Sequence, residues 1–183
     1  MASSPGARDV AESQATPERV VLVGFMGAGK TTVGPLLAAR LGWDFVDMDV
    51  RIEERLGMDV PTCFRTLGEE AFRAEEQAVA RELLDRRRLV VAAGGGAFTR
   101  PETRTLLRRN AITVWLRADL ATVLLRVPAD GRRPLAGNRD IMSSRLAERE
   151  AAYREADVTV ETSDVGPDAV AERVVLAVRQ RVE

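Results

Sequence analysis

The sequence predicts a single α/β domain built on a parallel sheet, with helices on both faces of the sheet. Short apolar runs alternate with longer helical patterns from Arg19 to the end of the chain, and this β-α-β order requires parallel strands. The chain has 183 residues, 45% hydrophobic and 30% charged, as expected for one globular domain. A glycine-rich loop follows the first apolar run, at the strand end where such sheets bind ligands.

The elements follow from local patterns along the chain. The apolar run 20–23 ends at Gly24, as a strand buried on both faces should. Residues 32–41 place apolar side chains on one helical face and stop at Gly42, a typical helix terminator. In the long helical stretch, Pro61 marks a helix start and Gly68 a break. Further strands are predicted at 43–47, 89–93, 111–116 and 158–161, and further helices at 49–56, 63–87, 101–109, 119–126, 139–156 and 167–181.

Composition excludes several classes of function. The net charge is −1, whereas proteins that bind nucleic acid or anionic membranes usually carry a basic excess. The chain has no histidine, so it cannot use histidine for catalysis or metal binding, and its one cysteine, Cys63, cannot form an internal disulfide. Residues 1–18 are small and polar and lack the apolar core of a signal peptide. We therefore expect a flexible tail at 1–18, a domain at 19–183 and a cytoplasmic protein without nucleic-acid or membrane partners.

Residues 24–31, GFMGAGKT, fit the phosphate-binding pattern G-x-x-x-x-G-K-[ST]. In such a loop, backbone N–H groups surround phosphate oxygens and the next helix presents its positive N-terminus to them. Lys30 would reach the β- and γ-phosphates of ATP, and the Thr31 hydroxyl would bind Mg²⁺. The alternative is a glycine-rich turn without a ligand. Lys30 is the only lysine among the 27 Lys and Arg residues of the chain. A codon bias toward arginine is one explanation of this imbalance. The other is a need for a compact ammonium at this position, which favours the phosphate-binding interpretation.

Two aspartates at the end of the second predicted strand supply candidate carboxylates for the metal. The third strand ends in Gly94, Gly95 and Gly96 instead of an acidic residue, so a magnesium ligand must come from elsewhere. Asp47 and Asp49 are two residues apart and would point to one side of an extended segment. One could serve the metal and the other the hydroxyl of a second substrate. The alternative is that either aspartate only caps the helix that follows.

Six motifs occur in order between residues 20 and 177. They are the loop 24–31, Asp47-x-Asp49 with Ile52-Glu53, Gly68-Glu69 leading to Phe72-Arg73-x-x-Glu76, Gly94-Gly95-Gly96-Ala97, Arg133-Pro134-Leu135, and Arg149-x-x-x-Tyr153. In these motifs the chain resembles the shikimate kinase family. The resemblance implies ATP-dependent phosphorylation of the 3-hydroxyl of shikimate, in the pathway to chorismate and aromatic amino acids. It also implies a monomer with a nucleoside-monophosphate-kinase-type fold of strand order 2-3-1-4-5.

The resemblance assigns a role to individual residues. Asp49 matches the residue that holds the acceptor hydroxyls and is the proposed base, and Arg73 and Arg149 match the arginines that bind the shikimate carboxylate. Such a carboxylate suits the planar fork of arginine. The assigned set is completed by Thr31 and Asp47 at Mg²⁺, by Gly94, Gly95 and Gly96 under the substrate ring, and by Gly27, Ala28, Gly29, Lys30, Thr31 and Thr32 at the nucleotide.

Three of the assigned positions have structural alternatives. Arg73 could instead form helix-surface ion pairs with Glu69 or Glu76, and Arg149 could pair with Glu150 or Glu155. Residues 127–138 have the Pro, Gly and Arg content of a lid that closes over phosphates, and the alternative is an ordinary surface loop. The resemblance favours Arg133 as the lid arginine that stabilises the transferred phosphoryl group, and its neighbour Arg132 could share this role.

Two departures from the family pattern and two competing functions are left open. Pro35 lies within the helix that follows the phosphate-binding loop, where proline is unfavourable. The segment 161–167 has no arginine where many relatives carry one against the adenine, so Arg126 or backbone groups would make that contact. The competing functions are a kinase of the same fold that acts on gluconate or a nucleoside monophosphate, and a catalytically idle nucleotide-binding module.

Overall fold

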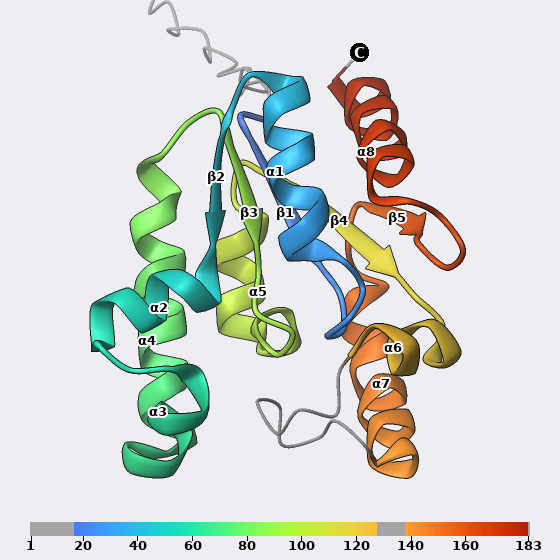
Figure 1. Cartoon of the computed structure of the whole chain (residues 1–183). Coiled ribbons are helices and arrows are strands. Elements are labelled where there is room, and N and C mark those ends of the chain that lie inside the picture. Colours follow the sequence, from blue (N-terminus) through green and yellow to red (C-terminus); the bar gives the residue numbers. More distant parts are fainter. Residues whose placement is uncertain (1–16, 128–137, 183) are drawn as a thin grey trace, which may run out of the picture.

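The computed structural model describes residues 17–127 and 138–182, and this part of the chain folds around one five-stranded sheet (Figure 1). The strand order is β2-β3-β1-β4-β5, and every neighbouring pair is parallel. The predicted fold class and strand order are therefore confirmed. In chain order the strands are β1 (Arg19–Val23), β2 (Asp44–Asp47), β3 (Leu89–Ala92), β4 (Ile112–Arg117) and β5 (Val158–Glu161).

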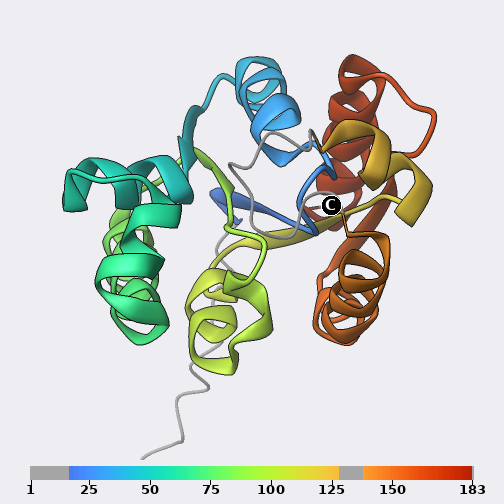
Figure 2. The same ribbon diagram turned by 60° about the horizontal axis from the view of Figure 1, so that its bottom comes forward.

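Helices cover both faces of the sheet. In chain order they are α1 (Lys30–Leu41), α2 (Met48–Leu56), α3 (Val60–Thr66), α4 (Gly68–Glu82), α5 (Pro101–Arg108), α6 (Leu120–Arg126), α7 (Arg139–Tyr153) and α8 (Pro167–Val182), with short 3₁₀ turns η1 (Leu83–Asp85) and η2 (Ala97–Thr99). Helices α1 and α8 lie side by side on one face, and α4 and α5 cover the other (Figure 2). No helix of the described residues is long and apolar enough to cross a membrane.

The predicted helix 63–87 is in fact two helices and a 3₁₀ turn. Helix α3 begins earlier than predicted because the Asp59 side chain accepts a hydrogen bond of 2.7 Å from the Thr62 backbone N–H, which caps the helix. Pro61 lies in its first turn, as predicted. Gly68 has a φ of +83° at the start of α4, so the break predicted there is confirmed and has a backbone conformation that favours glycine.

Helix α1 begins at Lys30, two residues before the predicted start, and ends at Leu41, followed by the C-cap residue Gly42 with a φ of +67°. Pro35 lies inside this helix, but its ring is on the exposed side. Its missing N–H therefore deprives Thr31 of a helical hydrogen bond where water can reach the carbonyl. On the buried side, Gly34 packs against Phe45 of β2, and a Cβ there would lie 2.1 Å from the Phe45 ring.

The parallel register brings three loops to one edge of the sheet. Leu22 of β1 and Asp47 of β2 are both paired with Ala92 of β3. The segments that follow these strands therefore start at the same level, at the carboxyl ends of the strands (Figure 1). The strands themselves form the core, because every residue of β1 and β3 is buried. The candidate site is built on this rigid support.

Candidate active site

The loop after β1 turns sharply into the N-terminus of α1. Gly24, Gly27 and Gly29 have positive φ angles of 142°, 77° and 103°, which L-residues rarely adopt. A Cβ at Gly24 would also lie 2.5 Å from the carbonyl oxygen of Leu116. The loop path therefore requires glycine, and it aims the positive end of the α1 dipole at the loop interior.

Lys30 is the first residue of α1, and its ammonium lies over this loop. Its Nζ donates to the carbonyl oxygens of Gly24, at 2.7 Å, and Phe25, at 3.0 Å. The only lysine of the chain thus has its charge where the loop and the helix N-terminus meet. A positive charge and a helix dipole at one point favour a polyanion.

Asp47 links the loop to the second strand. Its Oδ2 accepts a hydrogen bond of 2.7 Å from the Thr31 hydroxyl, and its Oδ1 accepts one of 3.0 Å from the backbone N–H of Asp49. The second bond makes Asp47 the N-cap of α2. Asp47 therefore caps the helix, as the alternative proposed, and also contacts Thr31.

Asp49 does not lie on an extended segment as predicted, because α2 begins at Met48 and Asp49 is in its first turn. The expectation that Asp47 and Asp49 share one side of a strand is wrong, and so is the alternative that Asp49 is the helix cap. The Asp49 carboxylate points instead toward the glycine loop, where its Oδ1 lies 2.7 Å from the position of a Cβ at Gly94. The two aspartates serve different parts of one site.

The glycine loop after β3 is the meeting point of the charged side chains. A Cβ at Gly94 would meet Asp49 at 2.7 Å, one at Gly95 would meet Arg149 at 3.4 Å, and one at Gly96 would meet Arg73 at 2.8 Å. The absence of side chains on residues 94–96 thus lets one carboxylate and two guanidinium groups approach the backbone from three different helices.

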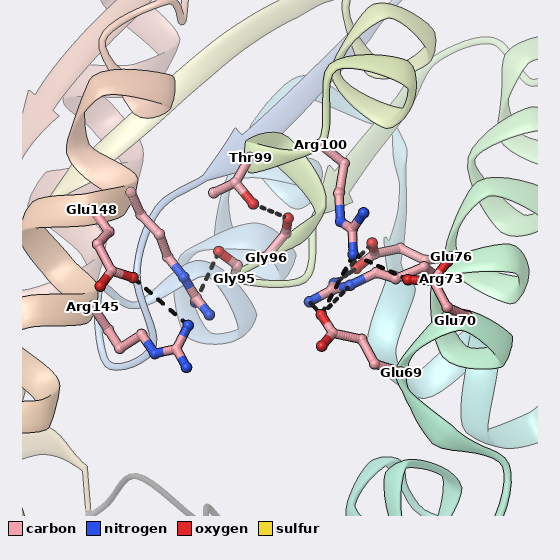
Figure 3. A network of polar contacts seen from close by, with 11 residues as sticks. Glu69, Glu70, Arg73, Glu76, Gly95, Gly96, Thr99, Arg100, Arg145 and Glu148 are labelled. Atoms are coloured by element: carbon pink, nitrogen blue, oxygen red, sulfur yellow. Dashed lines mark hydrogen bonds and ion pairs between the residues drawn. The ribbon is translucent and has the colours of Figure 1, made fainter.

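Arg73 extends from α4 and is held on two sides by carboxylates (Figure 3). Its Nη1 donates to both oxygens of Glu76, at 3.1 and 3.0 Å, and its Nε and Nη2 donate to Oε1 of Glu69, at 3.4 and 3.3 Å. Its guanidinium carbon also lies 5.4 Å from the centre of the Phe72 ring. Both ion pairs proposed as alternatives are therefore formed, and they place the guanidinium at Gly96 instead of on an outer helix surface.

Glu76 is unusual because its side chain is only 1% exposed. Burial raises the pKa of the Glu76 carboxyl above its usual value, and Asp49 raises it further, while Arg73 and Arg100 lower it. A buried carboxylate requires a partner, and Arg73 supplies one. Buried Glu76 thus fixes the position of the Arg73 guanidinium.

Arg149 and Tyr153 reach the glycine loop from α7. The Arg149 Nη1 donates to the carbonyl oxygen of Gly95 at 3.2 Å, and the Tyr153 hydroxyl donates to the same oxygen. Burial raises the pKa of Tyr153 to about 12, so the phenol keeps its proton. The guanidinium carbon of Arg149 is also 5.4 Å from the centre of the Phe25 ring, and Arg149 therefore spans the glycine loop and the loop after β1.

The ion pairs considered as alternatives for Arg149 do not form among the described residues. Glu150 contacts Arg117 and Arg154, and Glu155 contacts Arg104 and Arg108. The predicted lid arginines Arg132 and Arg133 lie within 128–137, outside the described residues. Residues 1–16 of the predicted tail are also outside them.

Arg126, the last residue of α6, contacts both the loop after β1 and the segment that follows β5. Its Nη2 donates to the carbonyl oxygen of Thr162 at 2.7 Å, and its Nη1 is 3.5 Å from the carbonyl oxygen of Gly27. Arg126 thus joins this loop to the segment 161–167, which carries no arginine of its own.

The side-chain oxygens of Thr31 and Asp47 fit a Mg²⁺ ion that also binds phosphate and water, and do not fit a metal held by protein ligands alone. Within 17–127 and 138–182, no group of three or more His, Cys, Asp or Glu side chains could hold a metal ion. Magnesium commonly uses one or two protein oxygens and completes its shell with phosphate oxygens and water. The Thr31 hydroxyl and the Asp47 carboxylate, 2.7 Å apart beside the phosphate-binding loop, match that requirement.

Sequence reasoning gave no function to four residues that complete the site. Glu69, Glu76 and Tyr153 belong to motifs that were noted, and the spacing of the two glutamates from Arg73 was the available signal. Arg100 had no signal, because it lies far from Arg73 in the sequence and reaches Glu69 and Glu70 only through the fold, at 3.6 Å each.

Comparisons with known proteins agree with this arrangement. A family model described as shikimate kinase matches residues 26–179. The shikimate kinase of Rhodopseudomonas palustris is 45% identical over 161 residues, or 86% of this chain and 79% of the relative. That of Halorhodospira halophila is 46% identical over 168 residues, or 90% of this chain and 95% of the relative.

Solved structures lead to the same family. A shikimate kinase from Acinetobacter baumannii in complex with shikimate aligns with a TM-score of 0.86 at 37% identity, over 91% of this chain and 95% of that one. A gluconokinase from Sinorhizobium meliloti aligns with a TM-score of 0.62 at 16% identity, over 91% and 94% of the two chains, and shares the fold alone. The family match covers well over half of the sequence, and the relatives are similar over most of their own length. The chain therefore belongs to the shikimate kinase family.

Proposed function

We propose that this chain transfers the γ-phosphoryl group of ATP to the 3-hydroxyl of shikimate. The observation that carries the proposal is the convergence of Asp49, Arg73 and Arg149 on residues 94–96, next to the phosphate-binding loop. Two guanidinium groups from different helices suit an anionic acceptor, and one carboxylate suits its hydroxyl groups. The related kinase from Acinetobacter baumannii, in complex with shikimate, supports the choice of acceptor.

The protein binds the acceptor at its carboxylate end and at its hydroxyl end, and this orients it. Arg73 and Arg149 bind its carboxylate through charged hydrogen bonds, while the ring lies against the bare backbone of 94–96. Asp49 binds the hydroxyl side. Because Asp49 is anchored in the first turn of α2, its carboxylate is held at a set distance from the arginines, and this positions the 3-hydroxyl for attack.

The donor lies in the loop after β1. Backbone N–H groups of residues 27–32 surround the phosphates, and Lys30 pairs with the β- and γ-phosphates. Thr31 and Asp47 would hold Mg²⁺, which supplies neutralisation of phosphate charge when bound. Arg126 lies between Gly27 and Thr162, and we propose that it contacts the adenine in place of the arginine missing from 161–167.

The transfer step needs little chemistry from the protein beyond charge and position. The 3-hydroxyl oxygen forms a bond to the γ-phosphorus, and the bond between that phosphorus and the β,γ-bridging oxygen breaks, so that ADP leaves with the electron pair. The Asp49 carboxylate accepts the hydroxyl proton. Lys30 stabilises negative charge on the phosphoryl oxygens, and we propose that Arg133, from the predicted lid 127–138, does so on their outer side.

We further propose that the protein works as a monomer in the cytoplasm, without a nucleic-acid or membrane partner. The net charge of −1 supports the absence of polyanionic partners. The family resemblance supports the monomeric state, and the need for ATP supports the location.

A coupled assay of ADP release tests the proposal directly. Shikimate, gluconate and the nucleoside monophosphates are each offered to the full chain with ATP and Mg²⁺, and a reaction without acceptor measures background hydrolysis. We expect turnover with shikimate only. Turnover with gluconate or a nucleotide but not with shikimate would assign the other acceptor, and nucleotide binding without any turnover would identify a non-catalytic module.

A further inference from the structure

One carboxylate oxygen lies between two guanidinium groups at the acceptor end of the site. Oε1 of Glu69 is 3.4 and 3.3 Å from Nε and Nη2 of Arg73, and 3.6 Å from Nη2 of Arg100. Arg100 follows η2 directly and is also 3.6 Å from a carboxylate oxygen of Glu70. Figure 3 shows Arg100 and Arg73 pointing toward each other, with Glu69 below them.

The donors of Arg73 are divided between two carboxylates that differ in exposure to solvent. Its Nη1 pairs with both oxygens of Glu76, whose side chain is 1% exposed and has no room to leave. Its Nε and Nη2 pair with Glu69, whose side chain is 55% exposed and whose hydrogen bonds are longer than the usual charged ones. Glu76 is therefore a fixed partner and Glu69 a replaceable one.

An acceptor carboxylate needs two adjacent N–H groups of an arginine for a bidentate pair. On Arg73 the adjacent pair not used by Glu76 is Nε and Nη2, which is the edge that Glu69 contacts. A bound acceptor and Glu69 therefore compete for the same edge. When the acceptor carboxylate displaces Glu69 from this edge, Glu69 needs another cation. Arg100 already lies near Oε1 of Glu69, at 3.6 Å.

We propose that Glu69 is an internal competitor for the acceptor carboxylate at Arg73, and that Arg100 is the positioning residue that receives Glu69 when the acceptor binds. The inference rests on the proposed function, because it assumes an acceptor with a carboxylate. Arg100 does not touch the acceptor in this scheme. It acts by offering Glu69 an ion pair that offsets the one lost at Arg73.

Steady-state kinetics of Glu69→Gln, Arg100→Gln and the double variant test this exchange, with shikimate varied at saturating ATP. The pairs are partly exposed and long, so each is worth little, and we expect changes in KM of about threefold to tenfold. Glu69→Gln lowers the shikimate KM because the competitor is removed, and Arg100→Gln raises it because Glu69 stays on Arg73. In the double variant the KM matches that of Glu69→Gln, while kcat changes by less than about twofold throughout.

Two controls separate the exchange from other effects. Arg87→Gln removes one positive charge from an exposed arginine that precedes β3 and pairs with Glu18, far from the glycine loop, and should leave the shikimate KM unchanged. The methyl ester of shikimate has no carboxylate charge, so Glu69→Gln should not lower its KM.

The possible results point to different conclusions. An equal rise in KM on adding Arg100→Gln to wild type and to Glu69→Gln would mean that Arg100 touches the acceptor itself, and would overturn the proposal. An unchanged shikimate KM in both single variants would also overturn it, leaving the proposed function intact. A wild-type protein that ignores shikimate would overturn both.

Discussion

Gly96→Ala adds a single methyl group beside Arg73 and tests whether the glycine loop must be bare. Gly96 has φ −101° and ψ −13°, which alanine adopts without strain. The substitution therefore acts only through space. Its Cβ would lie 2.8 Å from both Nη1 and Nη2 of Arg73 and 3.2 Å from Cζ, which is closer than van der Waals contact allows.

The size of the effect follows from how Arg73 is held. An ordinary contact begins at 3.4 Å, so a guanidinium that starts 2.8 Å away must move by about 0.6 Å. Glu76 holds one side of it at 3.0 Å and cannot follow, because its side chain is buried. Loss of one charged hydrogen bond to the acceptor carboxylate costs about 1.5–3 kcal/mol. The KM for shikimate should rise about tenfold to a hundredfold.

The assay is the coupled measurement of ADP release, with shikimate and ATP varied in turn. We expect a higher shikimate KM, an ATP KM close to that of the wild type, and a thermal midpoint lowered by only a few degrees. Gly96→Ala in the Arg73→Ala background is the matched control. If the methyl group acts by displacing Arg73, it should change the shikimate KM very little once that side chain is gone.

Two results would refute this reasoning. A normal shikimate KM in Gly96→Ala would mean that Arg73 can move without losing its hold on the acceptor. A rise of the same size in both backgrounds would mean that the methyl group meets the acceptor ring directly.

Four further changes test other parts of the site and its support. Lys30→Ala should lower kcat at least about 10²-fold without unfolding the protein, since the side chain acts on phosphate charge, and near-normal turnover with unchanged circular dichroism would contradict this. Arg133→Ala should lower kcat by about 10³ with a smaller change in the shikimate KM, whereas a pure KM effect would make Arg133 a ground-state binding residue. Gly34→Ala should reduce the free energy of unfolding by about 1–3 kcal/mol in urea titration, because its Cβ would lie 2.1 Å from the ring of Phe45; unchanged stability would show that the ring can move aside. Burial raises the pKa of Glu76 in the folded protein, so between its unfolded and folded pKa the folded state binds more protons, and the stability that this group contributes grows as the pH falls from neutral. The free energy of unfolding of the wild type, measured relative to that of Glu76→Gln, should therefore increase on acidification. A difference that does not depend on pH would contradict the raised pKa.

The parts of the molecule that could be predicted without coordinates are those governed by neighbours in sequence. The loop after β1 depends on glycines with positive φ at fixed spacing, and a strand must precede it and a helix follow it. The alternation of apolar runs with helical patterns likewise requires parallel strands. The fold class and the strand order implied by the family resemblance were therefore confirmed, whereas α1 begins at Lys30, two residues before the predicted start.

Predictions that depended on the conformation of a single residue were less secure. Asp49 was expected on an extended segment, but the Asp47 side chain caps α2, which begins at Met48, one residue before the predicted start. Capping energies are only about 1 kcal/mol, so a competing apolar pattern can hide the true helix start. Pro35 was unfavourable by the general rule for helix interiors, and the structure shows that its ring lies on the exposed side of α1.

Only the tertiary structure decided how the charges are shared at the acceptor end. Glu76 is buried beneath Arg73, and Glu69 lies between Arg73 and Arg100, which come from segments far apart in the chain. Burial determines which carboxylate is a permanent partner and which can be replaced, and burial arises from the packing of α4 against the glycine loop and α5. Local sequence rules describe neighbours within one or two helical turns, whereas an ion pair between distant segments depends on distances that the sheet register and helix packing set.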